Sequence, residues 1–150
     1  MSIVRFMIDV SALARYPVPA VAKRLDELSA AGQTVTTNLM ELELLGAVRD
    51  AEIYAKVAKL RQASVETLEM LEADIQRARE VQALLVERGE FGVAWTALVV
   101  AAVAERHGVV VLHCNAVFER IAEITGQGVE GMAEGPGRTS AAPVVNVPVE

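Results

Sequence analysis

Three polar side chains of this 150-residue chain stand where a metal ion could be held. Asp9 follows the apolar run 3–8, Asn115 follows the apolar run 109–113, and Glu43 lies within the leucine-rich stretch NLMELELLGAV. Carboxylate and amide oxygens are the ligands that Mg²⁺ and similar hard cations prefer. The residue types therefore favour a site for a divalent cation, provided that the fold brings them together.

Each of these residues also has a simpler interpretation. Asp9 and Asn115 are both residue types that cap the start of a helix. Glu43 can lie on a solvated helix face, and Glu41 points elsewhere because two helical residues differ in direction by about 200°. If Asp9 is instead a metal carboxylate, Ser11 is placed to fix its rotamer. The local sequence leaves both interpretations open.

The remaining candidates point away from other chemistries. Cys114 is the single cysteine and is most simply an inert core thiol, because nothing around it in the sequence would lower its pKa. His107 and His113 are too few and too scattered for a zinc site. The chain has neither a glycine-rich phosphate loop nor a serine nucleophile elbow.

The composition limits the classes of protein to which this chain can belong. Hydrophobic residues make up 53% of the chain and charged residues 23%, which suits one compact domain with a single core. The net charge of −6 and the lack of a basic stripe mean that nucleic-acid binding would need a local site or a bound cation. A single cysteine suits a reducing cytoplasm. The longest apolar run, 93–104, is too short to cross a bilayer, so we expect a cytoplasmic protein without a membrane partner.

Apolar periodicity predicts strands that alternate with helices. This alternation predicts an α/β fold, a three-layer α/β/α domain whose mostly parallel central sheet has about four or five strands. Residues 64–70 are compatible with a strand or a loop. In such sheets ligands bind beyond the carboxyl ends of the strands, where Asp9 and Asn115 are expected. The predicted strands are 3–8, 34–37 and 109–113, and the predicted helices are 20–31, 39–49, 50–62, 72–87, 95–107 and 116–124.

Helical spacing also predicts which side chains face the core. In the helix 39–49 the inward residues are expected to be Leu42, Leu45 and Val48, with Asn38 as its N-cap. In the helix 72–87 they are expected to be Ile75, Ala78, Leu84 and Leu85, and Trp95 is expected to pack in the core as well. From Gly126 onward the chain is rich in Gly and Pro, so we expect a domain over residues 1–127 and a flexible tail over 128–150.

Three stretches resemble the PIN-domain proteins of the VapC type, the toxin components of toxin–antitoxin pairs. They are IDVSAL at 8–13, MELELLGAVR at 40–49 and VVAAVAERHGVVVLHCNAVFERIAEITGQ at 99–127. The resemblance covers nearly all of residues 1–127. It implies a small α/β/α endoribonuclease that holds Mg²⁺ or Mn²⁺ in a cluster of acidic side chains.

The resemblance also assigns positions to those acids. The first aspartate of the family falls on Asp9 and its helical glutamate on Glu43. Its third acid falls at or near Ala97, its fourth at Asn115, and a further acid at Val117. This chain therefore departs from the pattern at three positions. We expect Asp9, Glu43 and Asn115 to form the catalytic and metal-binding site, and the Mg²⁺ or Mn²⁺ ion to be weakly bound.

These features imply a toxin of a type II toxin–antitoxin pair that hydrolyses RNA phosphodiester bonds. Its expected partners are an RNA substrate, a cognate antitoxin protein and a second copy of the chain. The alternative is a catalytically degraded PIN-fold binding module, which engages an antitoxin or a PIN partner without nuclease activity.

Overall fold

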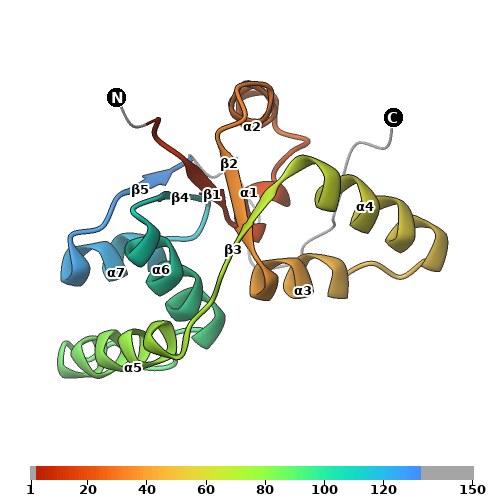
Figure 1. Ribbon diagram of the computed structural model, residues 1–150. Helices are drawn as coiled ribbons and strands as arrows, with labels where there is room; N and C mark the ends of the chain where they lie inside the picture. Colours follow the sequence, from red (N-terminus) through yellow and green to blue (C-terminus); the bar gives the residue numbers. More distant parts are fainter. Residues whose placement is uncertain (1–2, 133–150) are drawn as a thin grey trace.

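The computed structural model describes residues 3–132, and its centre is a parallel sheet (Figure 1). Five strands pair in the order β3-β2-β1-β4-β5, and every pairing is parallel. The three-layer α/β class predicted from the sequence is confirmed, with five strands. The strands are β1 (Phe6–Ile8), β2 (Thr34–Thr37), β3 (Glu66–Leu68), β4 (Val110–His113) and β5 (Val129–Gly131).

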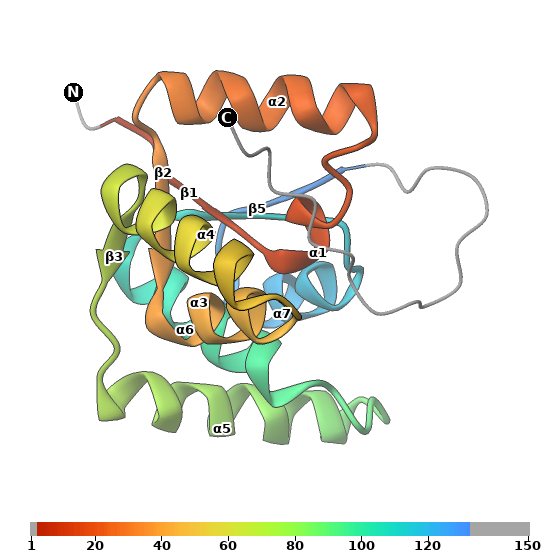
Figure 2. The same cartoon turned by 90° about the vertical axis from the view of Figure 1, so that its right-hand side faces the viewer.

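Helices cover both faces of this sheet. Figure 2 shows α2 on one side, and α5 on the other side as the helix farthest from the strands, with α6 and α7 between α5 and the sheet. The helices are α1 (Val10–Leu13), α2 (Pro19–Ala30), α3 (Asn38–Gly46), α4 (Ala51–Ser64), α5 (Glu72–Glu87), α6 (Trp95–His107) and α7 (Val117–Thr125). No helix in the range 3–132 is both long and apolar enough to cross a membrane.

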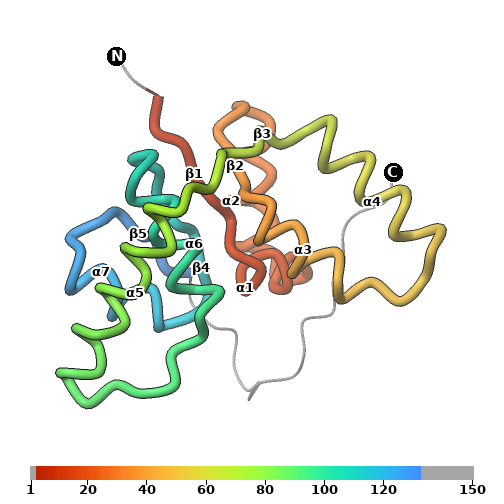
Figure 3. The backbone as a smooth tube through the Cα atoms, turned by 60° about the horizontal axis from the view of Figure 1, so that its bottom comes forward, coloured from red at the N-terminus to blue at the C-terminus, as the bar shows by residue number. Residues whose placement is uncertain are grey.

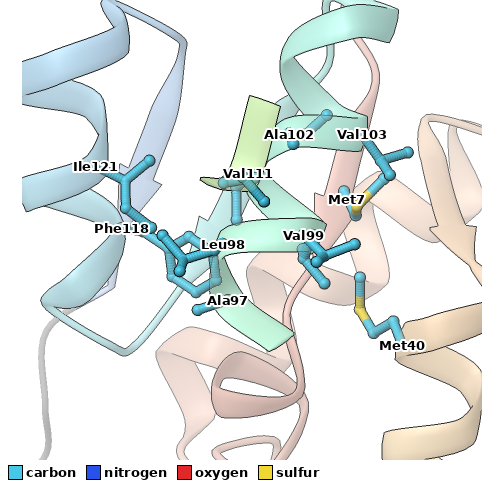
Figure 4. Packing of buried hydrophobic residues seen from close by; sticks show 14 of the residues in the cluster. Met7, Met40, Ala97, Leu98, Val99, Ala102, Val103, Val111, Phe118 and Ile121 are labelled. Carbon is cyan, nitrogen blue, oxygen red and sulfur yellow. The ribbon is translucent and has the colours of Figure 1, made fainter. Parts of the chain in front are cut away.

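Side chains alternate between two cores on either side of the strands. Phe6 and Ile8 pack with Val21, Leu25 and Leu28 of α2. Between them, Met7 points to the larger core, which α3, α5, α6 and α7 complete and part of which is shown in Figure 4. Because both faces of the strands are buried, the strands appear in the sequence as continuous apolar runs.

The order of the strands alone predicts the edge of the sheet at which a ligand would bind. The chain winds outward from β1 to β2 and β3, then returns to pair β4 with β1. Ligands of open parallel sheets bind outside the carboxyl ends of the strands at such a switch point. Here the switch point lies between β1 and β4, which end next to Asp9 and Cys114 respectively.

The helices lie close to the predicted positions, but three inward faces differ. In α3 the buried residues are Met40 and Leu44, whereas Leu42 is 73% exposed. Ile75 and Leu84 of α5 are exposed, and Trp95, predicted in the core, is 64% exposed at the first residue of α6. In α3 leucines lie on several sides of the helix, so periodicity alone could not select its buried side.

Two boundaries also differ. Thr37, and not Asn38, is the N-cap of α3, because its Oγ1 accepts a hydrogen bond from Met40 N at 3.2 Å. The predicted tail begins too early, since Val129–Gly131 pairs with Val111–His113 as the strand β5. An ion pair between Arg24 and Glu130, 2.9 Å, also joins β5 to α2. The rest of the predicted tail, residues 133–150, lies outside the described residues.

A buried ion pair stabilises the segment that connects β3 to α5. This segment carries the chain from α4 on one side of the molecule to α5 on the other (Figure 3). Asp74 accepts hydrogen bonds from Leu71 N at 2.8 Å and from Arg106 Nε and Nη2 at 2.8 and 3.0 Å. Burial raises the pKa of Asp74, but the hydrogen bonds from Arg106 and Leu71 outweigh it, so the net pKa lies below the usual aspartate value.

We predict that Asp74→Ala lowers the free energy of unfolding at pH 7 by about 1–3 kcal/mol, because Leu71 N and the Arg106 guanidinium both lose the carboxylate that accepts their hydrogen bonds. Urea unfolding measures the loss. The pKa of Asp74 is depressed in the fold, so its contribution is present above the unfolded pKa and lost as pH falls through the folded value. The difference between the two proteins should therefore shrink below about pH 4.

The matched control is Glu123→Ala, which removes the exposed pair with Arg88. Exposed ion pairs contribute less than about 1 kcal/mol, so this variant should unfold almost like the parent. Equal losses in the two variants would contradict a special role for the Asp74 pair.

Candidate functional site

The carboxylate of Asp9 is held in place by hydrogen bonds from Ser11. It directly follows β1, is only 8% exposed, and its backbone N–H donates to Leu112 O of β4 at 2.9 Å. Its Oδ2 accepts two hydrogen bonds from Ser11, one from the backbone N at 3.0 Å and one from Oγ at 2.6 Å. Asp9 thus caps α1, as its simpler interpretation predicts, and Oδ1 accepts no hydrogen bond from any described residue.

Ser11 also joins the ends of two strands. Its Oγ donates to Asp9 and accepts a hydrogen bond from Cys114 N at 3.0 Å, directly after β4. A single hydroxyl therefore links the acid at the end of β1 with the turn that carries Asn115. The prediction that Ser11 orients Asp9 agrees with this geometry.

Glu43 lies within the electrostatic reach of Asp9. It is on the exposed surface of α3, and within the described chain it has neither a hydrogen bond nor an ion pair. Partial burial raises the pKa of Glu43 above its usual value, and the negative charge of Asp9 raises it further. The negative charge of Asp9 thus acts on Glu43, and no described residue forms an ion pair with Glu43.

Asn115 mainly organises the turn into α7. Its side-chain Oδ1 accepts a hydrogen bond from Val117 N at 3.1 Å, its carbonyl accepts one from Phe118 N at 3.2 Å, and its N–H donates to His113 Nδ1 at 3.2 Å. The side chain is exposed beside the switch point. A carbonyl oxygen has two lone pairs, so Oδ1 keeps one acceptor site free.

The two other positions where the resemblance places acids belong to the hydrophobic core. Ala97 and Val117 are 7% and 5% exposed and belong to the same buried cluster as Phe118, whose ring is seen near Ala97 in Figure 4. Their side chains offer no oxygen. This half of the expected acidic site is therefore occupied by packed apolar groups.

Glu90 and Glu105, the acids on either side of Ala97 in the sequence, do not replace the missing ones. Glu105 forms an ion pair with Arg77 of α5 at 2.7 Å, near the other end of α6. Glu90, in the loop before α6, approaches Arg120 Nε through Oε1 at 3.4 Å, and its Oε2 is buried without a hydrogen-bond partner. Among residues 3–132 no three potential His, Cys, Asp or Glu ligands come together.

The donor set could therefore hold one divalent cation but not a pair. Asp9 Oδ1 and the carboxylate of Glu43 are open, and the free lone pair of Asn115 Oδ1 adds a neutral donor. Mg²⁺ is commonly held by one or two carboxylates, with waters and substrate phosphates as the other ligands. A second cation would need oxygens at Ala97 or Val117.

Comparison with known proteins identifies this architecture. The family model for the PIN domain matches residues 7–124, which include Asp9, Glu43 and Asn115. The chain belongs to the PIN domain family. Ribonuclease VapC21 of Mycobacterium tuberculosis is 35% identical over 127 residues, or 84% of this chain and 92% of that protein. Ribonuclease VapC51 of the same species is 31% identical over 123 residues, or 82% of this chain and 89% of that protein.

Solved structures show the same PIN fold. VapBC2 from Rickettsia felis, crystallised with a DNA fragment from its promoter, matches with a TM-score of 0.69 and 13% identity, over 85% of this chain and 98% of that one. VapBC-5 from Mycobacterium tuberculosis, a member of the VapBC family of toxin–antitoxin systems, matches with a TM-score of 0.62 and 21% identity, over 87% of this chain and all of that one.

One contributor to this PIN site was not predicted from the sequence. His113 is almost fully buried, and its Nδ1 must be the acceptor because Asn115 N–H donates to it. The proton of the neutral ring then lies on Nε2, which is 3.0 Å from Glu119 Oε1. β5 packs closely here, since a Cβ on Gly131 would lie 3.1 Å from that oxygen. The signal in the sequence was only the spacing of a histidine two residues before Asn115.

We predict that Ser11→Ala destabilises this PIN domain by about 1–3 kcal/mol, because it removes the hydroxyl bonds to Asp9 and Cys114 and leaves both groups without that partner. Urea unfolding measures the loss. Ser64→Ala is the control, since the Ser64 hydroxyl donates only to Leu60 O at an exposed place on α4. It should change stability by less than about 0.5 kcal/mol. A Ser11 variant as stable as the Ser64 variant would show that the bridge contributes little.

Proposed function

We propose that this PIN-domain protein is a VapC-like toxin of a type II toxin–antitoxin pair, an endoribonuclease that hydrolyses RNA phosphodiester bonds with a divalent cation at Asp9 and Glu43. The observation that carries the proposal is that Asp9 stands at the switch point between β1 and β4 with its Oδ1 free of hydrogen bonds from the described residues, and that its charge acts on Glu43 of α3. The similarity to two VapC ribonucleases over more than four fifths of the chain supports the reaction class.

The side chains have distinct roles in this proposal. Ser11 holds Asp9 in one rotamer, so that Oδ1 stays directed away from the two hydrogen bonds at Oδ2. Glu43 supplies the second charge, and Asn115 Oδ1 supplies a neutral oxygen while it accepts a hydrogen bond from Val117 N. A Mg²⁺ or Mn²⁺ ion bound there would polarise the phosphate and lower the pKa of a water nucleophile.

The missing acids should make such a nuclease slow. A positioned carboxylate that orients or deprotonates the attacking water typically contributes a rate factor of about 10²–10⁴. Ala97 and Val117 cannot supply one, because both side chains are aliphatic and buried. The proposed activity is therefore weak metal-dependent cleavage.

The partners follow from the same resemblance. We propose a cognate antitoxin, supported by the VapBC toxin–antitoxin proteins that share the fold. A second copy of the chain and a cytoplasmic location are also part of the proposal. Large apolar side chains are exposed on α3 and α4, which suits a protein partner. They are Leu42, Ile53, Tyr54 and Leu60.

A catalytically degraded binding module is the second candidate. The replacement of two expected acids by Ala97 and Val117, both inside the core, favours it specifically. Such a module would keep the fold and bind its antitoxin without cutting RNA.

An RNA-cleavage assay with Mg²⁺ and Mn²⁺ separates the two candidates. We expect slow cleavage by the parent chain, no cleavage by Asp9→Asn, and cleavage at least about 100 times faster by the double variant Ala97→Asp, Asn115→Asp. Thermal melting of each protein checks that it is folded, because Ala97 is buried. A folded parent chain no more active than Asp9→Asn would favour the binding module. Equal activity of the parent and the double variant would show that the missing acids are unimportant.

A further inference from the structure

We propose that the hollow between α5 and α6 is a subsite for one unpaired base of single-stranded RNA, with Trp95 as the surface on which the base stacks. The inference rests on the proposed function, because it assigns a binding residue for the same RNA substrate. The subsite needs no metal ion, so its occupation can be measured separately from cleavage.

The hollow has an apolar floor. It has a volume of about 170 Å³ and lies where α5 packs against α6. Ala78 of α5 and Leu98 and Val99 of α6 line it, and all three are buried. Pockets for small molecules usually measure about 300–1,000 Å³, so this one suits a single planar ring rather than a whole nucleotide.

Trp95 adds an aromatic surface to one side of the hollow. Its side chain lines the hollow and the residue is 64% exposed. Its ring forms no aromatic or cation–π contact with any residue in the described range 3–132. Exposed aromatic rings of this kind are the platforms on which proteins stack the splayed bases of single-stranded RNA. A stacked base would cover the indole face that the fold leaves in water.

Arg79 and Gln82 supply polar groups to the same hollow. Both line it from α5 and are exposed, and neither forms a hydrogen bond or an ion pair with a described residue. The neighbouring Arg77, by contrast, is paired with Glu80 and Glu105.

These polar groups favour a nucleotide over an apolar partner. A guanidinium binds phosphate, and a side-chain amide offers both a donor and an acceptor to the edge of a base. An apolar partner would cover the charge of Arg79 without a counterion, which costs free energy. The combination of indole, guanidinium and amide therefore matches a base and its phosphate.

The hollow lies at the same end of α6 as the expected nuclease site. Ala97 lies near Phe118 of α7, the helix that follows β4 (Figure 4). The first turn of α6 is therefore at the carboxyl end of β4. Residues two apart in a helix differ in direction by about 200°, so Trp95 and Ala97 face opposite sides of α6, about one helix width or 10–12 Å apart. An RNA strand that passes around this turn would place a base beside the cleaved bond in the hollow.

The fluorescence of Trp95 provides a direct test, because it is the single tryptophan of the chain. The parent chain is titrated with a single-stranded RNA oligonucleotide in EDTA, which prevents metal-dependent cleavage. We expect saturable quenching, since the base stacks on the indole. The same oligonucleotide annealed to its complement should quench much less, because its bases are already stacked in the duplex.

Variants separate stacking from charge, with RNA affinity measured by the fluorescence anisotropy of a labelled oligonucleotide. Trp95→Ala should weaken binding about 5- to 150-fold, whereas Trp95→Phe should retain most of the affinity because it keeps a ring. Arg79→Ala should lower the slope of log affinity against log salt concentration by about 0.7, as expected for one lost phosphate contact.

Lys23→Ala is the matched control for Arg79→Ala. Lys23 is exposed on α2, on the other face of the sheet (Figure 2), and no described residue forms an ion pair with it. This variant should leave both the affinity and the salt slope unchanged. Thermal melting checks that every variant is folded.

Equal RNA affinity of Trp95→Ala and the parent chain, or equal quenching by single-stranded and duplex RNA, would overturn the subsite. Loss of self-association in Trp95→Ala, measured by sedimentation, with no quenching of the parent by RNA would also overturn it, because the hollow would then be an interface between copies. If the parent cleaves RNA but is not quenched, the proposed function stands and only the subsite fails. Quenching without cleavage would retain the subsite and overturn the nuclease.

Discussion

The hydroxyl of Ser11 is the interaction on which this site depends. It donates to Asp9 and accepts from Cys114 N, so it joins the ends of the only two neighbouring described strands between which the winding of the sheet reverses. Parallel strands leave their last backbone groups without ladder partners, and a side chain must satisfy them. The same hydroxyl thus completes backbone pairing and fixes the rotamer of the site carboxylate. The Ser11 hydroxyl therefore serves both the pairing of the strand ends and the orientation of Asp9.

The site divides into a polar half and an apolar half. Asp9, Ser11 and Asn115 belong to loops and helix ends at the edge of the sheet, where polar groups are satisfied by short hydrogen bonds. Ala97 and Val117 belong to the first turns of α6 and α7 and extend the core to that edge. The fold therefore does not need the absent carboxylates, because apolar burial replaces charges that would repel one another. Binding of a cation does require carboxylates, so the requirements of folding and of cation binding differ at this site.

Much of the fold was predictable from local patterns, and the exceptions share a cause. The helices 72–87 and 95–107 were predicted at their observed bounds, because long amphipathic or apolar segments end at clear signals such as Gly108. The buried face of α3 was wrong, since leucines surround that short helix and tertiary packing chose Met40 and Leu44. β5 was missed because three residues, the last of them Gly131, are too few to show a periodicity. At the site, Asp9 and Ser11 were expected at a strand end, but the hydrogen bond from Asn115 to His113 depends on contacts that no spacing reveals.

Asn115 joins the turn after β4 to the start of α7 through its side-chain oxygen, although the N-cap of α7 is Ala116. An aspartate at this position would accept the hydrogen bond from Val117 N through one oxygen and keep a full negative charge for a cation. Asparagine keeps this hydrogen bond through Oδ1, but offers only a neutral lone pair beyond it. The exchange therefore preserves the helix start and removes charge from the site alone. The hydrogen bond to α7 depends on Oδ1, whereas the charge would come from the second carboxylate oxygen that asparagine lacks, so this fold does not depend on an acid at position 115.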